Sequence, residues 1–150
     1  MMSNQSNDPL DLKRFLDAQE ANYGRALAEL RVGLKETHWS WYVLPQAAGL
    51  GSSPMSRRYA IRSLAEARAY LAHPVLGVRL RECVAAINAH VGLSAEQILG
   101  EVDAQKLRSC LTLFLRADRS EALFAEALAR FFDGREDAAT VAILDGRAAE

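Results

Sequence analysis

The sequence predicts an all-α protein, a single compact multihelical domain of about six to eight helices. Apolar residues recur three or four positions apart through most of the chain, which places them on one face of successive helices. Capping residues and glycines divide this pattern into short segments. One run, residues 38–44, is rich in aromatic and β-branched residues, but no second strand accompanies it, and a lone strand is not stable.

The N-terminal part is predicted to contain a leader and then one or two helices. Residues 1–8 are polar and predict a disordered leader. Asp8 and Pro9 form a helix start, with an N-cap acid followed by proline at the first helical position. The apolar stripe that begins at Leu12 stops at Gly33. The pattern does not decide between one helix and two helices with a break near Ala18.

Residues 35–54 concentrate both tryptophans and two of the four prolines in an otherwise Ala- and Leu-rich chain. The prolines and glycines between 45 and 54 exclude a long regular element there. Residues 38–44 therefore predict a short buried helix that is followed by a loop.

Three helices are predicted between residues 63 and 100. Residues 63–66 and 94–97 have the capping-box pattern. The first box opens a helix that runs to Ala72, and the second opens a short helix that closes at Gly100. Between them, an amphipathic helix begins at Leu76 and ends at Gly92.

The C-terminal third predicts three more helices. Asp103 is predicted to cap a helix with Leu107 and Phe114 on its inner face. Residues 120–121 open the next helix, and the chain turns after it at Asp133. A last short helix spans 137–144, and residues 145–150 are predicted to be a frayed tail. The helical domain is thus expected to span 9–144.

Composition narrows the classes of partner and of cellular location. A net charge of −1 does not favour nucleic acid as a bulk partner. No apolar run approaches the length of a membrane span and no secretory signal is present, so no membrane partner and a cytoplasmic location are expected. Cys83 and Cys110 are expected to be free buried thiols rather than a disulfide.

No metal site and no cofactor are predicted, because the three histidines are scattered and lack ligand spacing. The Gly/Ser-rich loop lacks the P-loop pattern, but its N–H groups and hydroxyls make Gly49, Gly51 and Ser53 candidates for binding an anion. The alternative is a plain tight turn. Lys106 and Ser109 place an amine and a hydroxyl on one helix face, which a solvated surface also explains.

The aromatic stretch is the strongest candidate for a binding site. On a helix Trp39 and Trp41 point about 200° apart, so they are not expected to share one surface. One of them is expected in the core while the other, with His38 or Tyr42 and with Gln46, lines a pocket for a flat polar ligand. The alternative is a second hydrophobic cluster under the loop.

Four stretches resemble a bacterial family known as number 1810 among the domains of unknown function, some of whose members have carried the misleading label "calpastatin". They are "DLKRFLDAQ", "HWSWYVLPQAAGLGSSPMSRRYAI", "SLAEARAYLAHPVLGVRLRE" and "DAQKLRSCLTLF", and the resemblance covers about residues 8 to 144. The family usually has Phe at the position of Leu44, and Ser or Met at those of Cys110 and Leu111. These departures are mild.

The resemblance implies a multihelical domain, and through a distant similarity to NADAR-type domains it implies a pocket for a ribose-bearing ligand. Some of those domains act as N-glycosidases on ribosylated substrates. The similarity is at the level of the fold, which does not determine function. The residues to inspect on this basis are His38, Trp39, Gln46, Tyr59, Asp103, Lys106 and Ser109.

Two functional hypotheses follow, and a third is weaker. In the first, the protein cleaves an N-glycosidic bond of a nucleotide-like metabolite, with Asp103 as the carboxylate and with His38 or Lys106 as the acid. Asp103 is available for this role only if it does not cap its own helix. In the second, the domain is a non-catalytic ligand- or protein-binding module. In the third, a homodimer buries the tryptophans at its interface.

Overall fold

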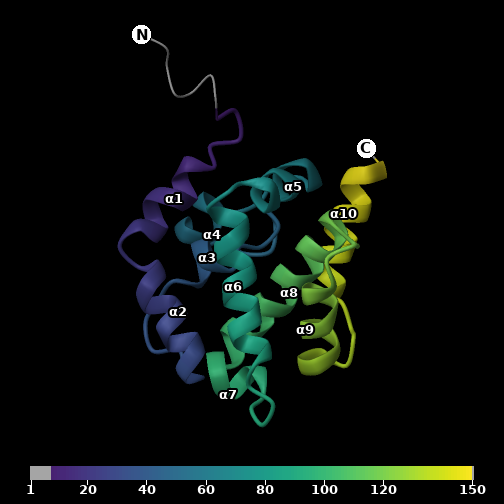
Figure 1. The fold of residues 1–150 in the computed structure, drawn as a ribbon. Coiled ribbons are helices and arrows are strands. Elements are labelled where there is room, and N and C mark those ends of the chain that lie inside the picture. Colours follow the sequence, from purple (N-terminus) through teal and green to yellow (C-terminus); the bar gives the residue numbers. More distant parts are fainter. Residues whose placement is uncertain (1–7, 150) are drawn as a thin grey trace.

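The computed structural model describes residues 8–149 and confirms the all-α class (Figure 1). Within this range there are ten helices, more than the six to eight predicted. The described residues form no sheet, and their one β-type pairing is a parallel bridge between Ala47 and Ile61. The helices are α1 (Lys13–Glu20), α2 (Tyr23–Val32), α3 (Ser40–Val43), α4 (Pro54–Arg58), α5 (Leu64–Ala72), α6 (Leu76–Asn88), α7 (Ala95–Leu99), α8 (Glu101–Ala117), α9 (Ala122–Phe132) and α10 (Ala138–Ala149).

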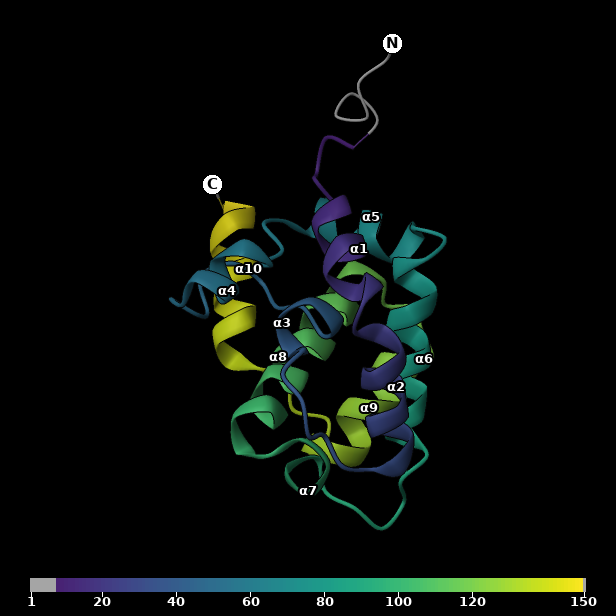
Figure 2. The same ribbon diagram turned by 90° about the vertical axis from the view of Figure 1, so that its left-hand side faces the viewer.

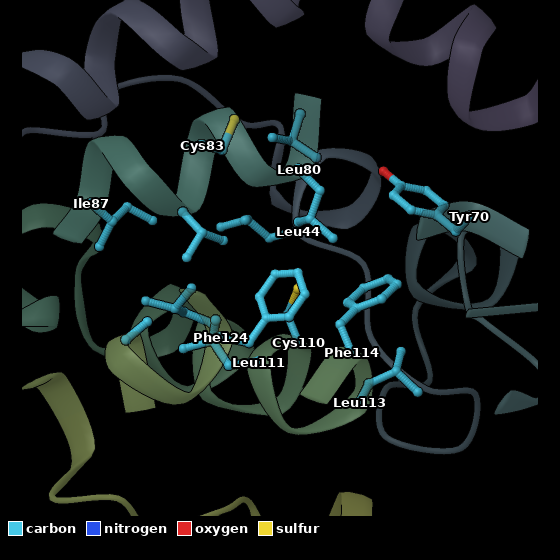
Figure 3. Packing of buried hydrophobic residues seen from close by; sticks show 14 of the residues in the cluster. Leu44, Tyr70, Leu80, Cys83, Ile87, Cys110, Leu111, Leu113, Phe114 and Phe124 are labelled. Atoms are coloured by element: carbon cyan, nitrogen blue, oxygen red, sulfur yellow. The ribbon is translucent and has the colours of Figure 1, made fainter. Parts of the chain in front are cut away.

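Helix α8 is the centre of the fold, because it packs against α5, α7, α9 and α10. Figure 2 shows it in the middle of the molecule, with α10 on one side and α6 on the other. The core close-up shows side chains of α6 facing those of α8 and α9 (Figure 3). These side chains are fully buried and include Leu80, Cys83, Leu111, Phe114 and Phe124. Helix α8, the longest of the described helices, is therefore buried over much of its surface. Its N-terminal end borders the candidate site described below.

The N-terminal region forms two helices, which resolves the alternative that the sequence left open. The break comes between Glu20 and Tyr23, slightly later than Ala18. Helix α1 begins at Lys13 rather than after Asp8, although the Asp8 carboxylate still caps it by accepting the N–H groups of Leu12 and Lys13. Residues 1–7 of the predicted leader lie outside the described residues.

Gly33 ends α2 as predicted. It adopts a left-handed φ of 92°, which favours glycine, and its N–H donates to the carbonyl of Glu29. A Cβ at this position would lie only 2.9 Å from Leu93 Cδ1. The turn that follows directs the chain toward residues 35–39, which form one wall of the candidate site.

The predicted caps are partly confirmed. The box at Ser94 and Gln97 is formed with both reciprocal hydrogen bonds. Ser63 accepts the N–H of Glu66, but the Glu66 side chain accepts from the N–H of Arg62 and does not close the box. Asp103 does not cap its helix. Helix α8 begins directly after Gly100, so Asp103 lies in the first turn and its carboxylate is available to other groups.

Several predicted boundaries differ from the structure. Helix α6 ends at Asn88, before Gly92. Helix α4, within the predicted loop region, begins at Pro54 with Ser53 as its N-cap. Helix α10 continues to Ala149, past the predicted end at Leu144, so residues 145–149 are helical rather than frayed. The helical pattern of a short terminal segment is weak, which is why the sequence did not reveal its full length.

Both cysteines are free and buried, as expected. Burial raises the pKa of the Cys83 thiol to about 12, and burial also raises the pKa of Cys110. Because the thiolate is the nucleophilic form, these side chains act as small apolar groups of the core. No helix among residues 8–149 is long and apolar enough to cross a membrane.

Candidate functional site

One cavity, of about 270 Å³, lies between residues 35–41 and the N-terminal turns of α8. His38, Asp103 and Lys106, which the sequence suggested as catalytic residues, all line this cavity, as do both tryptophans. The cavity therefore brings together a carboxylate, an imidazole, ammonium groups and indole rings from two segments that are far apart in the chain. The complete lining is Lys35, His38, Trp39, Ser40, Trp41, Val102, Asp103 and Lys106.

Glu29 of α2 holds the wall formed by residues 36–39. Its carboxylate accepts hydrogen bonds from the N–H groups of Glu36 and Thr37, from the Thr37 hydroxyl and from the indole N–H of Trp39, at 2.6 to 3.1 Å. Burial alone would raise the pKa of Glu29, but these hydrogen bonds outweigh it and lower the pKa to about 2. The ionised carboxylate thus fixes an irregular segment whose backbone donors have no helical partners.

The two tryptophans contribute to the cavity in different ways. Trp39 is 1% exposed and belongs to the core, whereas Trp41 is only partly buried. Trp39 precedes α3 with φ −144°, so it is not in a helical conformation. The prediction that the two rings share no surface is therefore wrong, because it assumed that both lie on the same helix.

Asp103 is at the centre of the charged groups. Its carboxylate lies 2.8 Å from Lys35 Nζ and 3.5 Å from Lys106 Nζ. Burial would raise the pKa of Asp103, but the hydrogen bond and charge of Lys35, the charge of Lys106 and the nearby Ser40 hydroxyl lower it below its ordinary value. The carboxyl group is therefore ionised at neutral pH and is not a proton donor.

Each ammonium group also lies over an indole ring. Lys35 Nζ is 5.1 Å from the centroid of the Trp39 ring, and Lys106 Nζ is 4.9 Å from that of Trp41. Both distances are in the range of cation–π attraction. The two lysines are thus held between Asp103 and the aromatic wall, with one positive charge in excess of the carboxylate.

Sequence reasoning missed Lys35, Ser40 and Glu29. The pairing of Lys35 with Asp103 joins distant parts of the chain, and no local spacing announces such a pair. Ser40 lies between the two tryptophans, but only the structure shows that it is 2% exposed and that its hydroxyl has no hydrogen-bond partner among the described residues. For Glu29, the available clue was an acid on a helix directly before an irregular segment.

The loop residues that the sequence proposed for ligand binding lie away from this cavity. The Gln46 carbonyl accepts the N–H of Ile61, next to the β-bridge. Gly49 has a left-handed φ of 104° and faces Ile143 of α10. Gly51 packs closely on the Ser56 side chain in the first turn of α4, and Ser53 caps α4. This loop is built as a connection between helices.

Tyr59 and Ser109 are also outside the lining of the cavity. The Tyr59 ring is buried, with its centroid 5.9 Å from that of Phe15 and 5.3 Å from that of Tyr42. The Ser109 hydroxyl is buried and donates to the carbonyl of Gln105 in its own helix. Both side chains therefore have structural partners of their own.

The described residues contain no group of His, Cys, Asp or Glu side chains that is placed to hold a metal ion. His73 Nδ1 accepts the N–H groups of Val75 and Leu76 at the start of α6, and His90 Nε2 lies 2.6 Å from the Leu30 carbonyl. His73 is the C-cap residue of α5, and its ring holds the start of α6. The ring of His90 contacts the last turn of α2.

The comparisons with known proteins agree with this fold. The model of the family described as "Protein of unknown function (DUF1810)" matches residues 9–144, and the chain belongs to this family. Among solved structures, the chain is similar to the crystal structure of the conserved hypothetical protein Rv1873 from Mycobacterium tuberculosis. The two are 50% identical over 92% of this chain and 99% of that chain, with a TM-score of 0.91. No curated protein matches the chain.

Proposed function

We propose that this member of the DUF1810 family binds a ribose-bearing, nucleotide-like metabolite in the cavity between residues 35–41 and α8, and cleaves its N-glycosidic bond. The observation that supports the proposal is the convergence of Asp103, Lys106 and His38 on one cavity with indole walls. Aromatic walls suit a flat base, and an ionised carboxylate suits the cationic sugar through which such a bond breaks.

The roles in this reaction follow from protonation states. Asp103 is ionised, so it stabilises positive charge at the anomeric carbon and does not donate a proton. The leaving nitrogen takes a proton from Lys106 or from His38 as the C–N bond breaks. Water then adds its oxygen to the anomeric carbon and returns a proton to that acid. The products are the free base and the sugar with a hydroxyl group.

A specific observation favours the alternative, a non-catalytic binding module. Asp103 is already engaged by Lys35 and Lys106, and this pairing reduces the charge that it offers to a cationic sugar. The third hypothesis, a homodimer, requires tryptophans at an interface. Trp39 is buried within one chain, which leaves Trp41 for such a contact.

The test combines binding and turnover. The protein is heated with NAD, ADP-ribose, ribose 5-phosphate or nucleosides to measure its melting temperature. Unheated mixtures with NAD, ADP-ribose or nucleosides are analysed for free base by chromatography. A ligand at 100 times its dissociation constant stabilises the protein by about 2.7 kcal/mol, or several degrees. We expect at least one compound to raise the melting temperature and to release its base, with Asp103→Asn abolishing release. Asp17→Asn, at an exposed pair on α1, is the matched control.

The outcomes separate the hypotheses. A stabilising ligand that is not cleaved would support the binding module against the enzyme. If none of these compounds bound to the protein and none was cleaved, the result would contradict the proposed function.

A further inference from the structure

We propose that the Ser40 hydroxyl, the first turn of α8 and the Lys106 ammonium group form a subsite for a phosphate group. This inference deepens the proposed function, because the phosphate would belong to the nucleotide-like ligand. It does not require that any bond is cleaved, so it can be tested separately.

The first argument is an unpartnered hydroxyl. Ser40 is 2% exposed and is among the residues that line the cavity. Its Oγ makes no hydrogen bond within the described part of the chain, although it is close enough to Asp103 to help lower the pKa of that carboxyl group. A buried polar atom without a partner destabilises the fold, and such atoms are rare in native proteins. The other buried hydroxyls of this region, those of Ser109 and Thr112, donate to carbonyls of α8. Ser40 is therefore the hydroxyl that a ligand would satisfy.

The second argument is the charge of the cavity. Lys35 and Lys106 face a single carboxylate, that of Asp103, and the exposed His38 at the rim adds no negative charge. Lys106 is the more weakly held lysine, because it lies 3.5 Å from Asp103 whereas Lys35 lies 2.8 Å away. Glu29 lies behind Trp39, where its carboxylate is occupied by the donors of residues 36–39. Among the described residues that line the cavity, two ammonium groups thus share one carboxylate, and this excess of positive charge favours an anionic ligand.

The third argument is the end of the helix. Helix α8 has 17 residues, its N-cap is Gly100, and no side chain caps its first N–H groups. Two residues of this turn, Val102 and Asp103, line the cavity. Free N–H groups and the positive end of the helix dipole attract anions, phosphate in particular. The hydroxyl, the ammonium group and these N–H groups are all hydrogen-bond donors, and phosphate oxygens are acceptors.

The experiment is calorimetric titration of the whole protein with inorganic phosphate at low ionic strength, with sodium chloride as the ionic-strength control. We expect saturable binding, and tighter binding of ribose 5-phosphate than of ribose. Ser40→Ala should weaken phosphate binding by about tenfold, since a hydrogen bond to a charged group is lost. Its melting temperature without ligand should equal or exceed that of the natural protein. Ser109→Ala, at a buried serine with a partner, is the matched control and should bind phosphate normally.

Two charge variants extend the test. Lys106→Gln should weaken phosphate binding by about tenfold, whereas Lys13→Gln, at an exposed lysine of α1, should not change it. Asp103→Asn removes the negative charge of the cavity and should tighten phosphate binding. The same variant abolishes base release under the proposed function, so the two readouts move in opposite directions.

Three results would overturn the subsite: no saturable binding of phosphate, unchanged affinity in Ser40→Ala, or a clear loss of stability in Ser40→Ala. The last would show that the hydroxyl serves Asp103 within the protein. Binding of phosphate without cleavage of any ribosylated compound would support the subsite and contradict only the enzymatic reaction. Cleavage of a nucleoside without any saturable binding of phosphate would support the enzymatic reaction and contradict the subsite.

Discussion

Two carboxylates of this protein, the buried Glu66 and the partly buried Asp103, are each paired with a basic side chain, and their surroundings differ sharply. Arg14 and Glu66 are 3% and 1% exposed and lie 2.7 Å apart. The Arg14 guanidinium also donates to the carbonyls of Leu10, Asp11, Arg58 and Ala60. Asp103, in contrast, faces a cavity, with a second lysine and an unpartnered hydroxyl beside it.

The difference separates an ion pair that holds the fold from one that is available to a ligand. The guanidinium of Arg14 ties α1 to the segment before α5, and every group around it has a partner. Around Asp103, in contrast, two ammonium groups share one carboxylate and the Ser40 hydroxyl has no hydrogen-bond partner among the described residues. Burial and ion pairing alone therefore do not identify a functional site. Polar groups that lack a hydrogen-bond partner next to a cavity do.

The largest expected change in the free energy of unfolding is at Arg14. Arg14→Met would leave the Glu66 carboxylate buried without its cation and would remove the guanidinium hydrogen bond from four carbonyls. We expect a loss of about 3–5 kcal/mol in the free energy of unfolding, measured by urea denaturation. A loss below about 1 kcal/mol would show that the pair is not structural and would remove the basis of the comparison.

A smaller effect is expected at Glu29, which supports the cavity from behind. Its pKa in the folded protein is about 2, below its ordinary value. The stability that it contributes is therefore present above about pH 4.5 and is lost as the pH falls toward 2. Glu29→Gln should cost about 2 kcal/mol at pH 7.

The check on Glu29 is urea denaturation of both proteins between pH 2 and pH 7. Because the amide does not ionise in this range, the variant should lose less stability on acidification than the natural protein. Identical pH dependence in the two proteins would contradict the role assigned to the carboxylate.

Asp103 should matter less to the fold than Arg14 or Glu29. In Asp103→Asn the amide oxygen still accepts a hydrogen bond from Lys35, so we expect a loss of about 1 kcal/mol by urea denaturation. The loss of base release should be far greater than this change in stability implies. A destabilisation as large as that of Arg14→Met would place Asp103 with the structural pairs instead.

The smallest effect is expected at the pair Lys13–Asp17 on α1. Both side chains are 61% exposed, and their atoms lie 2.8 Å apart. Exposed pairs contribute little, so Lys13→Met should change the free energy of unfolding by at most about 0.5 kcal/mol. A larger loss would show that a short distance, rather than burial, determines the contribution of ion pairs in this protein.

The sequence predicted the helical class and most helix positions because periodicity and capping are local properties. Gly33 and the box at Ser94 were predicted correctly for this reason. The site was predicted in part. His38, Asp103 and Lys106 do line one cavity, but Lys35 and Ser40 were missed because their roles depend on contacts between distant segments.

The glycine loop shows the limit of a local pattern. Its glycines were compatible with an anion site or with a plain tight turn, and in the structure they lie in the connection between α3 and α4, outside the lining of the cavity. A glycine-rich loop has the same local pattern in both cases, and only the position of the neighbouring helices distinguishes them.

The protein contains two tryptophans, and both line the cavity. Its tryptophan fluorescence therefore comes from this one place. Trp39, buried and hydrogen-bonded to Glu29, should emit at shorter wavelength than the partly exposed Trp41 under Lys106. A ligand that displaces Lys106 from the Trp41 ring would change the red edge of the spectrum and leave the blue edge in place. The molecule thus carries its own optical probe, and ligands can be screened without any label.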